Sequence, residues 1–191
     1  MEAAASYLRP YCPHEITDLL VKIELQPADF AQCNVGREMA ARMIHPGVAS
    51  AATLRRIQAR TRAAVFVQTQ NEVVVGVSGA LPLTPSGLGA VEGHQFEARD
   101  PADDHLCAPG DPLAAVYAWA FAATTRKASA AVVMMMIRLR EHYSDIPFFT
   151  RAVTPTGAKV VRGRMGYSPY PGAPDDLLWN PVRPLIEERA A

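Results

Sequence analysis

The sequence predicts an α/β (α+β) fold in which helices cover a central β-sheet, and three features indicate it. The first sixty residues have helical periodicity. Two valine-rich segments with a turn between them follow, which is typical of a β-hairpin. After residue 113, two apolar segments too short for independent helices alternate with two segments of helical pattern. This order of helices, hairpin, strand, helix, strand and helix is that of a layered α/β or α+β fold.

The composition excludes several classes of protein. The 191 residues include 19 Lys and Arg against 19 Asp and Glu, so no net charge would recruit nucleic acid or an anionic membrane. Cys12, Cys33 and Cys107 are widely spaced and odd in number, which argues against a disulfide framework and favours a reducing, cytoplasmic compartment. No signal-peptide pattern opens the chain. Apolar runs such as residues 130–137 are far shorter than the ~20 residues of a membrane span.

One domain over residues 1–191 is expected, with a mainly helical N-terminal part at residues 1–62. HEITDLLVKIEL has apolar residues at positions i, i+3, i+4 and i+7 from Ile16, and VGREMAARMI and SAATLRRIQART continue the helical pattern. A His-Pro-Gly sequence at residues 45–47 separates the last two helices. Residues 8–10 are a candidate for a short opening strand.

The segments AAVFVQTQ and EVVVGVSGALPL predict the two strands of a β-hairpin. The turn is expected at residues 70–71, and Pro82 and Pro85 are expected to end the second strand. TPSGLGAVEG then predicts a short helix capped by Thr84 or Ser86. The following EARDPADDHLCAPGDP has the polar, proline-bearing composition of a loop.

Residues 114–123 are a continuous apolar run, which predicts a strand buried on both faces, and residues 146–154 predict a second buried strand. They should be neighbours in the interior of one sheet. Between them, a long helix begins after TTRKAS. PTGAKVVRGRM predicts a last short helix, since Pro155 suits its first turn and Gly166 its end.

The C-terminal residues 170–191 are expected to form an irregular tail. SPYPGAPDD is rich in proline and glycine, which favours irregular backbone. DLLWNPV predicts one short strand that Pro181 either places at an edge or ends. Residues 186–191 should be exposed and dispensable for ligand binding.

The stretch TTRKAS at residues 124–129 has features of an anion site. A helix start has four backbone N–H groups without intrahelical partners, and the helix dipole adds positive potential there. Arg126 and Lys127 add charge at this end, where acidic residues are more usual, and the small residues 128–131 allow close approach to the backbone. The alternative is a solvated basic loop before a core helix.

The same stretch resembles a motif of the GNAT N-acyltransferase superfamily, whose Arg/Gln-x-x-Gly-x-Gly/Ala loop opens its third helix. Arg126 matches the first position and Ala131 the last, while Ser129 stands where glycine is usual. Downstream, FFTRAVT, PTGAKVVRGR and MGYSP follow the order of the family's fifth strand, short helix and Gly-Phe-x-Pro-like end, with Tyr167 in place of phenylalanine. The chain is thus identified as a degenerate member over residues 63–169 at most.

The resemblance implies a GNAT-like central mixed sheet with a V-shaped splay between two neighbouring strands. It implies acyl-coenzyme A, expected to be acetyl-CoA, as co-substrate, with no metal. The function implied is N-acyl transfer by direct attack of an amine on the bound thioester, whose oxygen a backbone N–H near residues 120–123 would stabilise. The cofactor-binding residues implied are Ala122, Ala123, Thr124, Arg126, Lys127, Ala128, Ser129, Ala130 and Ala131.

The catalytic residues stay open. Arg162 stands where the family often carries the tyrosine that protonates the departing thiolate, and a guanidinium is no proton donor at neutral pH. The acid is therefore missing or supplied elsewhere, with Tyr117, Tyr143 and Tyr167 as candidates. Four residues are candidate bases that the sequence does not rank, namely Glu72, Glu92, Glu97 and His94. A non-catalytic acyl-CoA-binding or protein-interaction module with this fold is the alternative function.

Six potential metal ligands lie within fourteen residues, but their spacing fits no zinc pattern, and a solvated acidic loop is expected instead. They are His94, Asp100, Asp103, Asp104, His105 and Cys107. This loop is also a candidate to lie across the acceptor mouth. The partner expected is a small-molecule or peptide amine acceptor, with no nucleic acid and no membrane, and a homodimer is left open.

Overall fold

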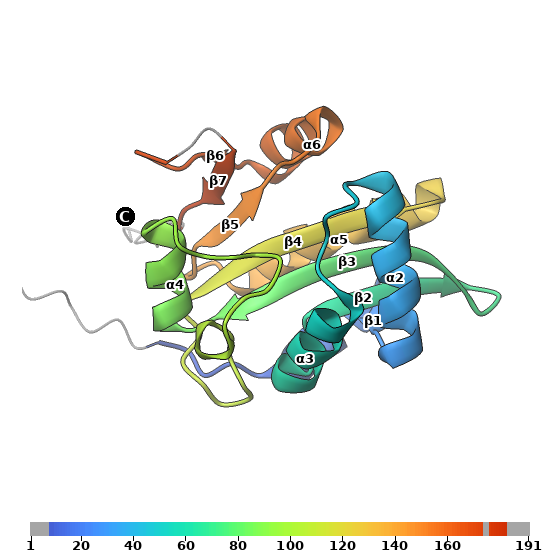
Figure 1. Cartoon of the computed structure of the whole chain (residues 1–191), viewed down its shortest axis with the longest axis horizontal. Coiled ribbons are helices and arrows are strands. Elements are labelled where there is room, and N and C mark those ends of the chain that lie inside the picture. The colour runs from blue at the N-terminus through green and yellow to red at the C-terminus, as the bar shows by residue number, and fades with distance from the viewer. Residues whose placement is uncertain (1–7, 174–175, 183–191) are drawn as a thin grey trace, which may run out of the picture.

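The computed structural model describes residues 8–173 and 176–182 and contains one seven-stranded mixed sheet (Figure 1). Its strand order is β1-β2-β3-β4-β5-β7-β6. Neighbouring strands are antiparallel except β4 and β5, which are parallel. The strands are β1 Gln26–Pro27, β2 Val65–Gln70, β3 Val73–Leu83, β4 Ala115–Ala123, β5 Phe148–Arg151, β6 Ser168–Pro169 and β7 Leu177–Asn180.

Helices cover both faces of this sheet (Figure 1). Helices α1, α5 and α6 contribute to the apolar cluster on one face, whereas α2, α3 and α4 contribute to two clusters on the other. Among the described residues, no helix is both long enough and apolar enough to cross a membrane. The helices are α1 Pro13–Val21, α2 Phe30–Met43, α3 Ala51–Thr61, α4 Pro85–Glu92, α5 Arg126–His142 and α6 Pro155–Met165, with a 3-10 turn at Asp103–His105.

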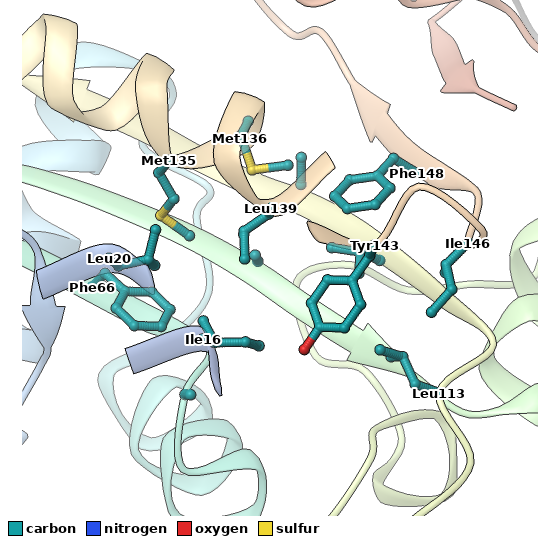
Figure 2. Packing of buried hydrophobic residues seen from close by; sticks show 14 of the residues in the cluster. Ile16, Leu20, Phe66, Leu113, Met135, Met136, Leu139, Tyr143, Ile146 and Phe148 are labelled. Atoms are coloured by element: carbon teal, nitrogen blue, oxygen red, sulfur yellow. The ribbon is translucent and has the colours of Figure 1, made fainter. Parts of the chain in front are cut away.

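The apolar stripe of α5 explains why this helix lies across the sheet. Met135, Met136 and Leu139 are almost completely buried against Phe148 of β5 and residues of α1 (Figure 2). Methionine side chains adapt to irregular gaps, so these residues of the helix pack into the core of the sheet.

Local signals in the sequence set most element boundaries. Ser50, Thr84 and Thr154 cap α3, α4 and α6 by accepting a backbone N–H in the first turn. Gly166 follows α6 with a left-handed φ of 71°, a conformation that costs glycine little. The predicted helices and their breaker at residues 45–47 are therefore confirmed.

Two details of the predicted hairpin are wrong. The turn falls at Asn71 and Glu72, whose positive φ angles of 49° and 65° suit a two-residue hairpin loop. Pro82 does not end β3 but lies within it, opposite Val116 of β4. It is tolerated because β2 ends its pairing at Gly79, so the missing N–H of Pro82 interrupts no ladder on that side.

The C-terminal strands differ in part from the expectation. β7 lies between β5 and β6 rather than at an edge, and Pro181 follows its last residue. Residues 168–169, expected to be irregular, form the two-residue β6 that pairs with β7. The prediction for residues 186–191 lies outside the described residues.

The predicted fold class is confirmed. Residues 114–123 and 146–154 provide β4 and β5, which are neighbours in the interior of the sheet, although β5 covers only Phe148–Arg151. The sheet is central and mixed, helices lie on both of its faces, and the N-terminal part is mainly helical. Together with the divergence of β4 from β5, this is the GNAT-like arrangement that the resemblance implies.

Candidate functional site

The central feature of the site is a fork between the two parallel strands. β4 pairs with β5 at only three positions, Val116 to Ala118, and then continues to Ala123 paired with β3 alone (Figure 1). A bulge coincides with this point, because Gly79 pairs with Ala120 and the next residue of β3 pairs with Ala118. Trp119 is thus an extra residue on β4. Bulges bend a strand and increase its twist, which accounts for the divergence.

The fork leaves backbone groups of β4 without a strand partner. The N–H of Val116 donates toward β5, to Pro147 at 3.1 Å, whereas that of Thr124 donates toward β3, to Val75 at 2.9 Å. Because N–H groups alternate in direction along a strand, those of Phe121 and Ala123 are directed into the fork. They provide donors at the position where a thioester oxygen is expected.

The first turn of α5 begins two residues after β4 ends. Thr125 is the N-cap, and its hydroxyl accepts the N–H of Ala128 at 3.1 Å. The N–H of Ser129 already donates to the Thr125 carbonyl at 2.9 Å. Within the described part of the chain, the first-turn N–H groups of Arg126 and Lys127 have no hydrogen-bond partner. Fewer N–H groups are therefore free to bind an anion at this helix start than the prediction for residues 124–129 assumed.

Of the two basic side chains at this helix start, one forms an ion pair and the other does not. Lys127 Nζ lies 2.6 Å from Glu24 in the turn after α1, and Gln68 of β2 donates to the same carboxylate at 3.0 Å. These contacts lower the pKa of Glu24, with the Lys127 hydrogen bond as the largest cause. Arg126 is exposed and has no partner among the described residues. It supplies the uncompensated charge at this position.

The nine predicted cofactor-binding residues thus fall into two groups. Ala122, Ala123 and Thr124 lie at the end of β4, and residues 126–131 form the first turns of α5. Within the second group, Ala128 and Ala131 are buried against the sheet, and the N–H groups from residue 128 onward serve the helix or its cap. Their role in cofactor binding stays a prediction.

On the opposite face of the sheet from α5, a cavity of about 730 Å³ lies beside the fork. Both strands of the fork line this cavity, β4 with Trp119 and Ala120 and the end of β5 with Arg151 and Val153. The other walls are α2, the loop after α2 and residues 94–99, which we call the strap. A volume of this size is typical of small-molecule sites.

The strap is fixed to the sheet and to α3. Trp119 Nε1 donates to the Ala98 carbonyl at 2.7 Å. Two residues further on, Asp100 accepts hydrogen bonds from Arg56 at 2.8 Å and Thr53 at 3.1 Å. These bonds lower the pKa of Asp100, with the Arg56 bond as the largest cause. The strap therefore holds a defined position over the cavity.

The three candidate tyrosine acids are separated by the sheet. Tyr143 and Tyr167 are buried in the cluster beneath α5, away from the cavity. Tyr117 lines the cavity at the base of the fork, and its ring centroid lies 5.1 Å from that of Phe96 on the strap. Burial raises the pKa of Tyr117 to about 12, so the hydroxyl is protonated at neutral pH. Arg162 is exposed on α6.

Two of the four candidate bases line the cavity and two lie elsewhere. Glu97 and His94 line the cavity from the strap, whereas Glu72 lies in the hairpin turn and Glu92 ends α4. The Glu97 carboxylate accepts the backbone N–H of Arg99 at 2.9 Å.

The predicted acidic loop is held by ion pairs. Arg56 pairs with both Asp100 and Asp103. Cys107 is buried, which raises the pKa of its thiol to about 12. Over the described ranges, no group of three or more His, Cys, Asp or Glu side chains is placed to hold a metal ion.

Reasoning from the sequence did not identify four residues that line the cavity. Trp119 was expected only as part of a buried strand, because no local pattern marks the bulge that exposes its indole. Arg37, Arg99 and Arg151 belong to three segments far apart in the chain. A cluster of this kind leaves no signal in sequence spacing.

No family model matches this chain, and no curated protein matches it. Among solved structures, it is similar to the GNAT-like decarboxylase GphF in complex with isobutyryl-CoA. The two chains share 16% sequence identity, with a TM-score of 0.42, and the match covers 80% of this chain and 79% of that one. The GNAT-like fold is therefore assigned from the strand order, the parallel pairing and the fork of this chain itself.

Proposed function

We propose that this protein is an N-acyltransferase that moves an acyl group, with acetyl as the first candidate, from coenzyme A to an amine. The observation that carries the proposal is the fork. On one face of the sheet it meets the free N–H groups at the start of α5, and on the other it meets a cavity of about 730 Å³. A cofactor that passes through the fork would reach an acceptor held in the cavity.

Each part of acyl-CoA has a matching part of the site. The pyrophosphate suits the N–H groups of Arg126 and Lys127 and the free Arg126 guanidinium. The pantetheine amides match the unpaired edge of β4 beyond Ala118. The thioester oxygen would accept a hydrogen bond from Phe121 or Ala123, whose N–H groups carry positive potential to the position where negative charge develops.

In the reaction, the amine nitrogen attacks the thioester carbonyl carbon. A C–N bond forms, the C–S bond breaks, the nitrogen releases a proton and the thiolate of coenzyme A leaves. Glu97 and His94 are the bases nearest to this chemistry, because both line the cavity. No covalent enzyme intermediate is needed.

Tyr117 would stabilise the thiolate by a hydrogen bond rather than by full proton transfer. Its pKa of about 12 lies above the ~8.5 of an ordinary thiol, so transfer of the phenolic proton would be unfavourable. The thiolate would then take its proton from solvent. This role needs only a protonated hydroxyl at the base of the fork.

The first test is binding of coenzyme A. At one hundred times its dissociation constant, a ligand stabilises the folded state by ~2.7 kcal/mol. For a chain of this length that corresponds to a rise in Tm of about 5–10 °C. If neither coenzyme A nor acetyl-CoA changes Tm, the proposal is overturned.

A matched pair of variants locates the phosphate. Ser129 and Ser86 are both exposed serines in the first turn of a helix, on α5 and α4 respectively. Ser129→Asp should weaken coenzyme A binding more than tenfold, ~1.4 kcal/mol, whereas Ser86→Asp should not. Neither variant should lose stability, because a carboxylate suits a helix start.

Transfer itself is measured as release of free thiol from acetyl-CoA in the presence of a panel of amines, with mass spectrometry of the acceptor. Acceptor-dependent thiol release supports the enzyme. Binding of acetyl-CoA without transfer to any amine would instead favour the non-catalytic acyl-CoA-binding module.

A further inference from the structure

The charged side chains that line the cavity are unevenly paired. Arg151 of β5 pairs with Asp176 at 3.1 Å, and the Glu97 carboxylate accepts a backbone N–H of the strap. The guanidinium groups of Arg37 and Arg99 have no acidic partner among the described residues. Among the described residues, the cavity therefore presents two guanidinium groups without an ion-pair partner, against one carboxylate, Glu97, that has none either.

Arg37 is the more constrained of the two. It projects from α2, where the preceding Gly36 packs so closely on Val77 of β3 that an added Cβ would lie 2.8 Å from that side chain. Its Nε is shielded from solvent and has no hydrogen-bond partner among the described residues. A buried donor without an acceptor is costly, so this N–H is poised for an acceptor that a ligand supplies.

Arg99 faces the same cavity from the strap. Its guanidinium carbon lies 3.4 Å from the position that a Cβ on Gly47 would occupy, so the side chain extends toward the loop after α2. The residues on either side of it are fixed, Ala98 by Trp119 and Asp100 by Arg56 and Thr53. The backbone at Arg99 is thus held in place before any ligand binds, which reduces the ordering that the strap undergoes on binding.

Beside these two cations the wall is apolar. The apolar lining from α2, the loop after it, α3 and β2 comprises Ala40, Ile44, Val48, Ala49, Leu54 and Val65. A ligand complementary to this part of the cavity has an anionic oxygen group for the guanidiniums and an apolar body for the wall.

We propose that the acceptor is an amino acid with an apolar side chain, whose carboxylate is held by Arg37 and Arg99 while its amine faces the fork. This deepens the proposed function and rests on it for the identity of the amine as acceptor. The arrangement selects a free amino acid over the N-terminus of a peptide, because a peptide has an amide in place of the carboxylate next to the amine.

The test uses matched pairs that differ only in this group: leucine and leucinamide, methionine and methioninamide, phenylalanine and phenylalaninamide. Binding to the full chain is measured by calorimetry, without coenzyme A and with saturating coenzyme A. In at least one pair the acid should bind about tenfold or more tightly than the amide, since charge-assisted hydrogen bonds are the strong ones. No preference for the acid in any pair would overturn the proposal.

Variants test the two arginines separately. Arg37→Gln and Arg99→Gln should each reduce the preference for the acid about tenfold. Arg42→Gln is the control, because Arg42 is exposed on the same helix as Arg37 and does not line the cavity. Equal affinity for the acid in all three variants would also refute the proposal. Arg37→Gln should keep its Tm, which separates lost binding from lost fold.

The outcomes distinguish this inference from the proposed function. Binding of coenzyme A without a preference for the acid over the amide of any amino acid refutes the amino-acid proposal but not the proposed acyltransferase function. Selectivity for the carboxylate without binding of coenzyme A leaves the two arginines as an amino-acid site and removes the acyltransferase.

Discussion

The hydrogen bond that closes the fork offers a direct test of its construction. Thr150 of β5 is 3% exposed, and its hydroxyl donates to the Ala118 carbonyl of β4 at 2.9 Å, at the last paired position. Thr150→Val keeps the shape of the side chain and removes the donor. A buried acceptor left without this partner costs ~1–3 kcal/mol. Burial of the added methyl group offsets ~0.8 kcal/mol of this cost.

The net destabilisation expected is about 1 kcal/mol, which lowers the Tm of a chain of this length by about 2–4 °C. Scanning calorimetry measures it, and amide hydrogen exchange should rise in β5 more than in the hairpin of β2 and β3. Thr69→Val is the control, because Thr69 is only partly buried in β2 and its hydroxyl has no hydrogen-bond partner among the described residues. It should change stability by less than ~0.5 kcal/mol. An unchanged or higher Tm for Thr150→Val would show that this bond does not hold the fork.

Three further predictions concern the strap, Tyr117 and the stability of the protein at low pH. Trp119→Phe removes the bond to the Ala98 carbonyl, so hydrogen exchange in the strap should rise and the acceptor KM should increase with little change in kcat. Strap exchange equal to wild type would contradict this. Tyr117→Phe should lower kcat about tenfold or less. The pH profile of kcat between pH 6 and 9 should stay unchanged, because the Tyr117 pKa of about 12 lies outside that window. Loss of a titration step from this profile would show instead that the hydroxyl transfers its proton. His142 and then Arg9 lower the pKa of Glu15, so its contribution is present above the ordinary glutamate pKa of ~4.3 and is lost as pH falls through the lowered value. Glu15→Gln should therefore flatten the fall of Tm below about pH 4.5, and an identical Tm profile would refute the linkage.

Local chemistry explains why so much of the fold is readable from sequence. Helix starts at Ser50, Thr84 and Thr154 and the end at Gly166 depend on residues within one turn of the boundary. β4 is marked by a continuous apolar run and β5 by a shorter apolar segment, and the long helix between them is marked by its apolar stripe. The turn at residues 71–72 was displaced by one position, because a hairpin's register depends on both strands and not on the turn letters alone.

The start of α5 was predicted only in part. The sequence indicated a helix start with basic residues, and the structure has one. Which N–H groups stay free was decided by Thr125, whose side chain caps Ala128 and whose carbonyl accepts from Ser129. The partner of Lys127 was beyond the reach of local reasoning, since Glu24 lies 103 residues earlier in the chain.

By itself the sequence determined the type and order of the elements, because helix caps, apolar periodicity and turn residues act over a few neighbouring positions. The family resemblance implied a splay between two strands, but only the tertiary structure decided where the fork opens, since the bulge at Trp119 follows from the pairing of β4 with β3 and the fork begins where β4 stops pairing with β5. The cavity was decided there too. Its wall draws on segments from Gly36 to Asp176, and residues so far apart come together only when strand register and helix packing fix them at the same time.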